Sequence, residues 1–237
     1  MRTLFFVIYT ILHTVYTLYH LLIVYILGAM GMKDEQEARI ASTARNWGKA
    51  LVLVSGSKIE VEGADLVPRD RAVLFVSNHQ SYFDIPLLLG FIPGAKGFIA
   101  KIELAKIPIV NIWMKKMHSL LLDRENLRKS LLTMRQAIEI LKDGHSLVIF
   151  PEGTRSKGGP VAAFKRGSLS IAEKAKVPVV PVSISGTYKI LEGNKGFKIR
   201  PAIVKVHISE PIYPWELPAG ADLAAIVRER ILNDMDS

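Results

Sequence analysis

The stretch between Arg2 and Lys33 constrains the fold most, because it contains no Asp, Glu, Lys or Arg. It consists mostly of Leu, Ile, Val, Phe and Tyr, and it is long enough for a helix that crosses or deeply enters a bilayer. A cleaved signal peptide is the weaker alternative, since the apolar part exceeds a usual signal and no small-residue cleavage site closes it. The sequence therefore predicts a membrane-binding N-terminal helix.

A second helix is expected after Gly31. Apolar residues recur there at intervals of four and three along one stripe, and basic residues occupy the other face. The stripe comprises Ile40, Ala44, Trp47, Leu51 and Val54, and the basic face carries Arg39, Arg45 and Lys49. We therefore expect residues 1–57 to form a two-helix membrane segment, which spans once or dips into one leaflet, and residues 58–237 to form a separate domain.

The composition is typical of a chain that meets lipid and an anionic partner. Hydrophobic residues make up 49% of the chain, and its mean hydropathy is +0.24, both high for a soluble protein. The formal charge of +9 suggests nucleic acid, a phospholipid surface or a phosphorylated substrate. Because there is no cysteine, the chain can form no disulfide, thiolate nucleophile or cysteine-based metal site.

From residue 58 onward, short apolar runs alternate with amphipathic ones, which indicates an α/β fold with a mostly parallel central sheet flanked by helices. Expected strands cover residues 59–61 at an edge, 72–76, 97–100, 120–122, 147–150, 178–184 and 203–208. Expected helices cover 102–117, 125–143, 168–176 and 221–233, and residues 186–200 read as a mobile basic loop.

A histidine and a carboxylate follow the continuously apolar run at residues 72–76. His79 and Asp84 would lie just past the carboxyl end of that strand, where open α/β sheets bind their ligands. Asp84 could accept a hydrogen bond from one ring nitrogen of His79, which would leave the other nitrogen to take a proton from a hydroxyl. Asp84 before Ile85 and Pro86 is equally typical of a helix N-cap.

A second polar motif, residues 150–156, also follows a buried strand and should open on the same edge of the sheet. Gly153 allows close backbone approach, Thr154 offers a hydroxyl, and Arg155 offers a planar fork suited to phosphate oxygens. Lys157, Lys165 and Arg166 strengthen the positive field. A solvated basic loop is the alternative interpretation of this stretch taken alone.

Six motifs follow one another along residues 78–181. They are Asn78-His79-x4-Asp84, Lys101-x-Glu103-Leu104-x3-Pro108, Asp123-Arg124, Phe150-Pro151-Glu152-Gly153-Thr154-Arg155, Phe164-Lys165-x-Gly167 and Val177-Pro178-Val179-Val180-Pro181. In this order and spacing they resemble the glycerolipid acyltransferase family, most closely the bacterial 1-acyl-glycerol-3-phosphate acyltransferases. The likeness runs over residues 58–181 and, with the N-terminal helices, covers most of the chain.

The resemblance implies transfer of a fatty acyl group from acyl-coenzyme A or acyl carrier protein to the sn-2 hydroxyl of 1-acyl-glycerol-3-phosphate, giving phosphatidic acid. His79 would be the general base and Asp84 would orient its ring, without a covalent acyl-enzyme. Lys101 and Arg155 would bind the acceptor phosphate. The remaining pocket-shaping residues would be Glu152, Gly153 and Thr154. No cofactor or metal ion is implied, because the thioester is a co-substrate.

The chain departs from the family pattern at two positions. Asn111 and His118 stand where the family prefers glycine, which bears on acceptor binding rather than on the His79 chemistry. We expect His118, His145 and His207, which lie outside the motifs, to be structural. Basic residues after the apolar stretch favour a cell-membrane protein with its catalytic domain on the cytoplasmic side.

Other function classes stay open at this point. The same chemistry could act on another lysolipid, or a membrane-associated lipid hydrolase could use Ser81 with His79, although no Gly-x-Ser-x-Gly elbow is present. A non-enzymatic binder of anionic lipid or nucleic acid would explain the charge but not the apolar N-terminus. We expect no nucleic-acid partner, since neither a Walker A loop nor zinc-finger spacing occurs.

Overall fold

A seven-stranded sheet forms the centre of this computed structural model, which describes residues 1–165 and 167–236. The strands are β1 (Lys58–Glu62), β2 (Leu74–Ser77), β3 (Lys96–Lys101), β4 (Leu120–Leu122), β5 (Ser146–Ile149), β6 (Val179–Ser185) and β7 (Ile203–Ile208). Their order is β1-β7-β6-β2-β5-β3-β4, and every neighbouring pair is parallel except β6 and β7. The expected mostly parallel sheet is confirmed. Arg166, expected in the basic loop, lies outside the described residues.

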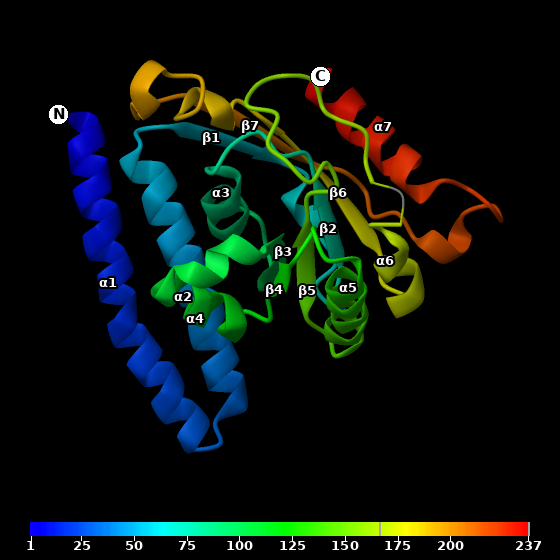
Figure 1. Cartoon of the computed structure of the whole chain (residues 1–237), viewed down its shortest axis with the longest axis horizontal. Helices are drawn as coiled ribbons and strands as arrows, with labels where there is room; N and C mark the ends of the chain where they lie inside the picture. Colours follow the sequence, from blue (N-terminus) through cyan, green and yellow to red (C-terminus); the bar gives the residue numbers. More distant parts are fainter. Residues whose placement is uncertain (166, 237) are drawn as a thin grey trace.

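Helices cover both faces of the sheet (Figure 1). They are α1 (Arg2–Ala29), α2 (Lys33–Val54), α3 (Asp84–Phe91), α4 (Pro108–Lys116), α5 (Leu127–Lys142), α6 (Ser170–Ala175) and α7 (Leu223–Asp236). Helices α2 and α3 pack on one face, and α5, α6 and α7 pack on the other. The fold is therefore an α/β sandwich with a helical hairpin, α1 and α2, on one side.

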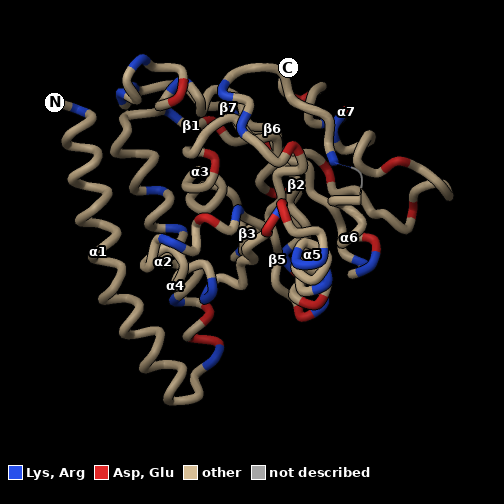
Figure 2. The backbone as a smooth tube through the Cα atoms, in the orientation of Figure 1, with Lys and Arg blue, Asp and Glu red and all other residues tan. Residues whose placement is uncertain are grey.

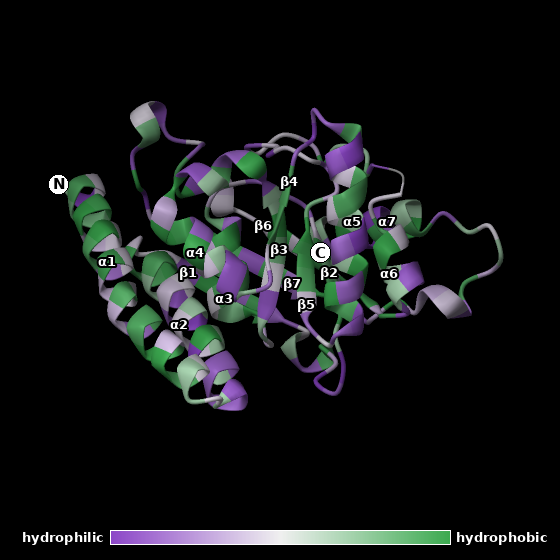
Figure 3. Ribbon diagram, turned by 60° about the horizontal axis from the view of Figure 1, so that its bottom comes forward, coloured by the Kyte–Doolittle hydropathy of each residue, from purple (hydrophilic) through white to green (hydrophobic). Residues whose placement is uncertain are grey.

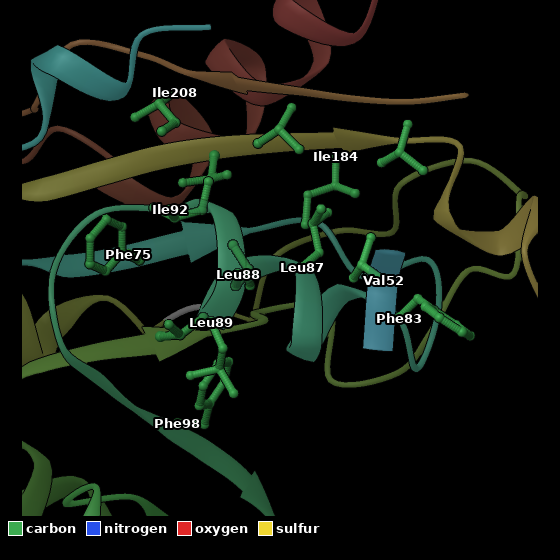
Figure 4. Packing of buried hydrophobic residues seen from close by; sticks show 14 of the residues in the cluster. Val52, Phe75, Phe83, Leu87, Leu88, Leu89, Ile92, Phe98, Ile184 and Ile208 are labelled. Carbon is green, nitrogen blue, oxygen red and sulfur yellow. The ribbon is translucent and has the colours of Figure 1, made fainter. Parts of the chain in front are cut away.

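Alternation along the central strands explains the two helical layers. Phe75 belongs to a buried cluster with Leu87 and Leu88 of α3, whereas its neighbour Leu74 belongs to a second cluster with Leu141 of α5. Successive side chains of a strand point to opposite faces, so a run that is apolar throughout needs cover on both sides. Figure 4 shows the first cluster, in which α3 packs between the sheet and Val52 of α2.

The hairpin exposes an apolar surface along α1. This helix has 28 residues and is about 42 Å long at 1.5 Å per residue. Beyond Arg2 it carries no Lys, Arg, Asp or Glu (Figure 2), and it is mostly hydrophobic in colour (Figure 3). Among the described residues it is the one helix long and apolar enough to cross a membrane, by length and composition. Its buried residues are Thr17, Leu21 and Val24.

Two glycines let α2 and α3 cross in direct backbone contact. A Cβ atom on Gly48 would lie 2.5 Å from the carbonyl oxygen of Pro86, and one on Gly90 would lie 2.4 Å from the backbone nitrogen of Lys49. Both distances are impossible for real atoms, so a side chain at either position would push the helices apart. The hairpin is thus docked directly on the helix that begins with Asp84.

The segment 102–117 is helical as expected, but it is divided into two helices at Pro108, where a new turn was expected to begin. A 3₁₀ helix runs over Ile102–Lys106, and α4 begins separately at Pro108. Proline lacks a backbone N–H and fixes φ near the helical value, so it suits the first turn of a helix and not its interior. Pro108 therefore starts a new helix after a turn at Ile107.

The segment 186–200 also differs from a free surface loop. It contains 3₁₀ helices at Thr187–Lys189 and Lys195–Phe197, and Ile190 between them is fully buried. Thr187 is buried as well and faces Asp84. The first half of the segment 186–200 is therefore fixed at the same edge of the sheet as His79.

Candidate active site

Parallel strands bring the sequence motifs to one edge of the sheet. His79 follows β2, Arg155 follows β5, Lys101 ends β3, and Arg124 follows β4. These four strands are adjacent and parallel, so their carboxyl ends meet at the same edge. The motifs are separated by up to 76 positions along the chain and still form one surface.

His79 and Asp84 form a close, largely buried pair. His79 Nδ1 lies 2.6 Å from Asp84 Oδ2, and the two side chains are 17% and 0% exposed. The imidazole ring stacks on Phe150 with 4.0 Å between ring centroids. Because the carboxylate holds Nδ1–H, the tautomer leaves Nε2 with the lone pair that can accept a proton. This geometry would allow His79 Nε2 to accept a proton from a hydroxyl placed beside it.

The Asp84 carboxylate is held by several donors besides His79. Oδ2 accepts hydrogen bonds from the backbone N–H of Gln80 at 2.7 Å and of Ser81 at 2.9 Å, and Oδ1 accepts one from Thr187 Oγ1 at 2.6 Å. A buried carboxylate needs such donors to replace water. Asp84 is the first residue of α3, and its side chain turns back to the preceding loop rather than capping the helix.

Glu152 joins the two polar motifs through backbone hydrogen bonds. Its Oε1 accepts from the N–H of His79 at 2.7 Å, and its Oε2 accepts from the N–H of Ala162 at 2.9 Å. Burial raises the pKa of Glu152, while these two donors lower it. The N–H of Ser156 in turn donates to the carbonyl of His79 at 2.8 Å. The carboxylate of Glu152 thus fixes the loop that carries His79.

Arg155 is already paired with a buried carboxylate. Its Nη1 donates to Glu192 Oε1 at 2.7 Å, and its guanidinium lies 3.5 Å above the ring of Tyr82. Glu192 is 2% exposed and Arg155 is 21% exposed. Glu192 also accepts hydrogen bonds from the N–H of Tyr82 at 2.9 Å and from Ser81 Oγ at 2.6 Å. One nitrogen of the fork is therefore anchored, which orients the remaining donors.

Further cations lie around Gly153. Its carbonyl accepts a hydrogen bond from Arg124 Nη1, and a Cβ atom at this position would lie 3.1 Å from Lys165 Nζ. Gly153 has φ +73°, a left-handed conformation that suits glycine. Thr154 is exposed beside it, and Lys101 is exposed with its ammonium 3.2 Å from Glu103. These groups leave a positively charged rim next to His79.

Comparison with known protein families shows to which family this chain belongs. A family model described as Acyltransferase matches residues 58–185, which is more than half of the chain. This chain belongs to the acyltransferase family. The match spans β1 to β6 and so includes every residue of the site described above, except Thr187 and Glu192, which follow β6.

Several relatives of this acyltransferase are known by name. The 1-acyl-sn-glycerol-3-phosphate acyltransferase LPAT1 of Arabidopsis thaliana is 39% identical over 181 residues, and the aligned region covers 76% of this chain and 49% of LPAT1. A 1-acyl-sn-glycerol-3-phosphate acyltransferase of Borreliella burgdorferi is 27% identical over 190 residues, covering 80% and 76%. The chain therefore spans about half the length of its plant relatives and more of the bacterial one.

A solved structure matches over the whole chain. The 1-acyl-sn-glycerophosphate (LPA) acyltransferase PlsC from Thermotoga maritima superposes with a TM-score of 0.79 at 34% sequence identity, covering 100% of this chain and 97% of that one. Its coverage includes the helical hairpin, which lies outside the family match. The hairpin and the sheet thus occur together in another acyltransferase.

Two cavities flank the site of this acyltransferase. One, of about 140 Å³, lies between the hairpin and the sheet and is almost wholly apolar. Its walls include Trp47, Ile85, Leu89, Ala100, Leu104 and Trp113. The other, of about 590 Å³, lies beside Phe150 and Gly153 on the α5 and α6 side and combines apolar walls with basic side chains. Its basic residues are Arg124, Arg135, Lys165 and Lys174.

Sequence reasoning missed Thr187 and Glu192, which complete the site from the segment after β6. A usable signal was present, because β6 is a parallel neighbour of β2 and its carboxyl end must lie at the same edge. Asn78 connects these two strand ends, since its side-chain amide pairs with both backbone groups of Ile184 at 2.8 and 2.9 Å.

Proposed function

We propose that this acyltransferase moves a fatty acyl group from the thioester of acyl-coenzyme A or acyl carrier protein to the 2-hydroxyl of 1-acyl-glycerol-3-phosphate. The product is phosphatidic acid. The observation that carries the proposal is the 2.6 Å contact between His79 Nδ1 and Asp84 Oδ2 at the carboxyl edge of the sheet, in a chain of this family. The acceptor is proposed because the relatives described above are 1-acyl-sn-glycerol-3-phosphate acyltransferases.

The chemistry needs one proton acceptor. His79 Nε2 takes the proton of the acceptor hydroxyl as its oxygen attacks the thioester carbonyl carbon. The tetrahedral intermediate collapses, the carbon–sulfur bond breaks, and the thiolate leaves with the proton from the imidazolium. The buried Asp84 carboxylate stabilises that imidazolium, and backbone N–H groups near Gly153 are our candidates for the donors to the oxyanion. No acyl-enzyme forms.

The acceptor phosphate fits the positively charged rim. Arg155 keeps donors that are not used by Glu192, and Lys101 lies at the end of the neighbouring strand β3. A guanidinium anchored through one nitrogen loses less freedom when it binds phosphate, which favours affinity. Glu152, Gly153 and Thr154 would shape this pocket through the loop they form.

The apolar surfaces of the hairpin side, away from the positively charged rim, suit the acyl chain and the membrane. We assign the apolar cavity between the hairpin and the sheet to a fatty acyl chain, since its lining contains almost no polar surface. The exposed apolar face of α1 would enter the bilayer. We place the catalytic domain at the cytoplasmic face of the cell membrane, because basic residues of α2 follow the apolar stretch.

Release of free thiol tests the reaction directly. The chain has no cysteine, so a thiol-reactive dye reports the released coenzyme A or carrier protein without background from the enzyme. The proposal is supported if thiol release requires lysophosphatidic acid, which is 1-acyl-glycerol-3-phosphate, and if mass spectrometry detects phosphatidic acid. Release that requires a different lysolipid would change the acceptor and keep the chemistry.

Thiol release without any acceptor would instead indicate a hydrolase. The geometry argues against it, because Ser81 Oγ donates to Glu192 at 2.6 Å and accepts from the N–H of Phe83 at 3.0 Å. A nucleophilic serine would need its hydroxyl beside His79 Nε2. Absence of thiol release with both donors and all acceptors would contradict the proposed function.

A further inference from the structure

A second histidine cluster lies at the edge of the sheet opposite to His79. His145 directly precedes β5, whereas the active-site residue Phe150 directly follows it. Glu37 comes from α2, and His118 comes from the turn between α4 and β4. Three separate elements, one of them in the hairpin, thus bring potential ligands together away from the active site.

The three side chains are close enough to share an ion. His118 Nε2 lies 3.2 Å from Glu37 Oε1, and the rings of His118 and His145 stack with 3.6 Å between centroids. One ligand atom from each residue lies within 4.8 Å of the others. Ligands around a tetrahedral zinc ion are roughly 3.3 Å apart at bond lengths of about 2.0 Å, so small side-chain rotations suffice.

The backbone at His118 is unusual. Its φ is +55°, in the left-handed region that residues other than glycine seldom adopt. Strained backbone of this kind persists where the surrounding structure or a function requires the side chain. The chain keeps an imidazole at a position where glycine would fit the backbone better.

The surroundings leave room for an ion and its waters. The cluster lines a cavity of about 330 Å³. Lys96 also lines this cavity, but its ammonium donates to the carbonyls of Leu88, Ile92 and Gly94 at 3.3, 2.9 and 2.7 Å. Other charged and polar lining residues are Arg45, Ser42 and Ser146.

We propose that Glu37, His118 and His145 bind a divalent transition-metal ion of the zinc type, with water completing its coordination. Two imidazole nitrogens and one carboxylate oxygen are a ligand set that such ions accept, and hard ions such as Mg²⁺ prefer oxygen ligands. The ion would connect α2 of the hairpin to the loops before β4 and β5. Arg45 opposes it with a positive charge, so the affinity is expected to be below that of a fully enclosed structural zinc site.

Cobalt binding tests the site on the full chain in detergent after treatment with a chelator. We expect one Co²⁺ per chain, visible through its d–d absorption and displaced by Zn²⁺. Because there is no cysteine, the spectrum reports nitrogen and oxygen ligands alone. His145→Ala should weaken binding at least about tenfold, since loss of an outer-shell partner alone costs 10- to 100-fold. His207→Gln, which removes a half-buried imidazole outside the cluster, is the matched control and should bind normally.

A second variant separates metal binding from folding. His118→Gly removes a ligand and also relieves the left-handed backbone, so it should fold as well as the wild type without metal. Zn²⁺ at 100 times its Kd should raise the Tm of the wild type by about 5–10 °C and leave that of His118→Gly unchanged. Equal Tm shifts in both proteins, no saturable Co²⁺ binding by the wild type, or loss of the Co²⁺ spectrum in His79→Ala would each overturn the proposal.

Discussion

Two groups of histidine and carboxylate occupy opposite ends of the same sheet, and they differ in how the carboxylate is held. At the carboxyl edge, the described residues supply Asp84 with hydrogen bonds from His79, Gln80, Ser81 and Thr187, and its side chain is fully buried. At the amino edge, Glu37 contacts His118 at 3.2 Å and is 44% exposed.

The difference shows what each group can do. A carboxylate with its lone pairs occupied by fixed donors orients a ring and stabilises positive charge, and it has little capacity left for an ion. A half-exposed carboxylate beside two stacked imidazoles keeps lone pairs for a ligand. We therefore expect substitutions at the carboxyl edge to lower the reaction rate, and substitutions at the amino edge to leave the rate unchanged.

The largest effect is expected from His79→Ala. Loss of a general base lowers kcat by about 10²–10⁴, measured as acceptor-dependent thiol release. The control His207→Gln removes an imidazole outside the site and should keep the wild-type rate. A fully active His79→Ala protein would break the comparison, because the carboxyl edge would then not carry the chemistry.

Substitution of Arg155 tests whether a guanidinium that is already paired with Glu192 also binds the substrate phosphate. We expect Arg155→Ala to raise the KM for lysophosphatidic acid about 10- to 100-fold, as for loss of a charge-assisted hydrogen bond worth about 1.5–3 kcal/mol, with a smaller change in kcat. The substitution also removes the ion-pair partner of the buried Glu192 carboxylate, to which Ser81 and Tyr82 still donate, so we expect a loss of about 3 kcal/mol in the free energy of unfolding.

A double variant separates these two effects of Arg155. Arg155→Ala combined with Glu192→Gln removes the unpaired charge and should recover much of the lost stability in a thermal melt, while the KM stays high. If the KM recovers together with the Tm, then Arg155 acts through the fold and not through the phosphate.

Thr187→Val probes the set of donors around Asp84. The isosteric change leaves Asp84 Oδ1 without its hydroxyl donor, so we expect a loss of about 1–3 kcal/mol in the free energy of unfolding and about tenfold in kcat. Thr133→Val is the matched control, since it removes a hydroxyl that donates to the carbonyl of Leu121 on another part of the sheet. A fall in kcat equal to that of the control would mean that Thr187 only supports the fold.

The smallest effect is a pH dependence of stability at the amino edge. Burial, followed by the charge of Arg45, lowers the pKa of Lys96 from 10.5 to about 7. Between these values the unfolded chain binds the extra proton and the folded chain does not, so stability rises as pH increases above about 7. The three carbonyl acceptors of the ammonium oppose this shift and limit its size.

Thermal melts from pH 6 to pH 9 measure this contribution. The difference in Tm between the wild type and Lys96→Met, measured at each pH, should rise by a few degrees from pH 6 to pH 9. Lys96→Met should retain the wild-type rate of thiol release. A difference that falls with pH would contradict the lowered pKa, and a rate loss comparable to that of His79→Ala would break the contrast between the edges.

Much of the fold follows from local patterns in the sequence. Apolar residues recur at helical spacing after Asn126 and predict α5, because such an apolar stripe must pack against the sheet. In the structure the Asn126 side chain caps this helix by accepting a hydrogen bond from the N–H of Lys129. Continuous apolar runs predict strands buried on both faces, and parallel strands bring their trailing motifs to one edge. That reasoning places His79 and Arg155 at one edge of the sheet, whereas the expectation for Lys101 came from the family resemblance.

Other features depend on contacts that local patterns do not encode. Glu192 lies 37 residues from Arg155 and 110 from Tyr82, in a polar stretch whose charges suggest only solvation. The approach of His118 to Glu37 depends on the path of the hairpin across the sheet. In the sequence alone, Gly48 is only a residue of low helix propensity, and the close crossing of α2 with α3 explains why glycine is needed there.

The crossing of α2 and α3 at Gly48 and Gly90 has a mechanical consequence. At the crossing point backbone lies directly against backbone, which leaves little room there to absorb a displacement. A tilt of the hairpin, imposed by the thickness or curvature of the bilayer, would pass directly to α3, whose first residue is Asp84. We would then expect the alignment of His79 with Asp84 to respond to the physical state of the membrane, so that turnover depends on lipid composition.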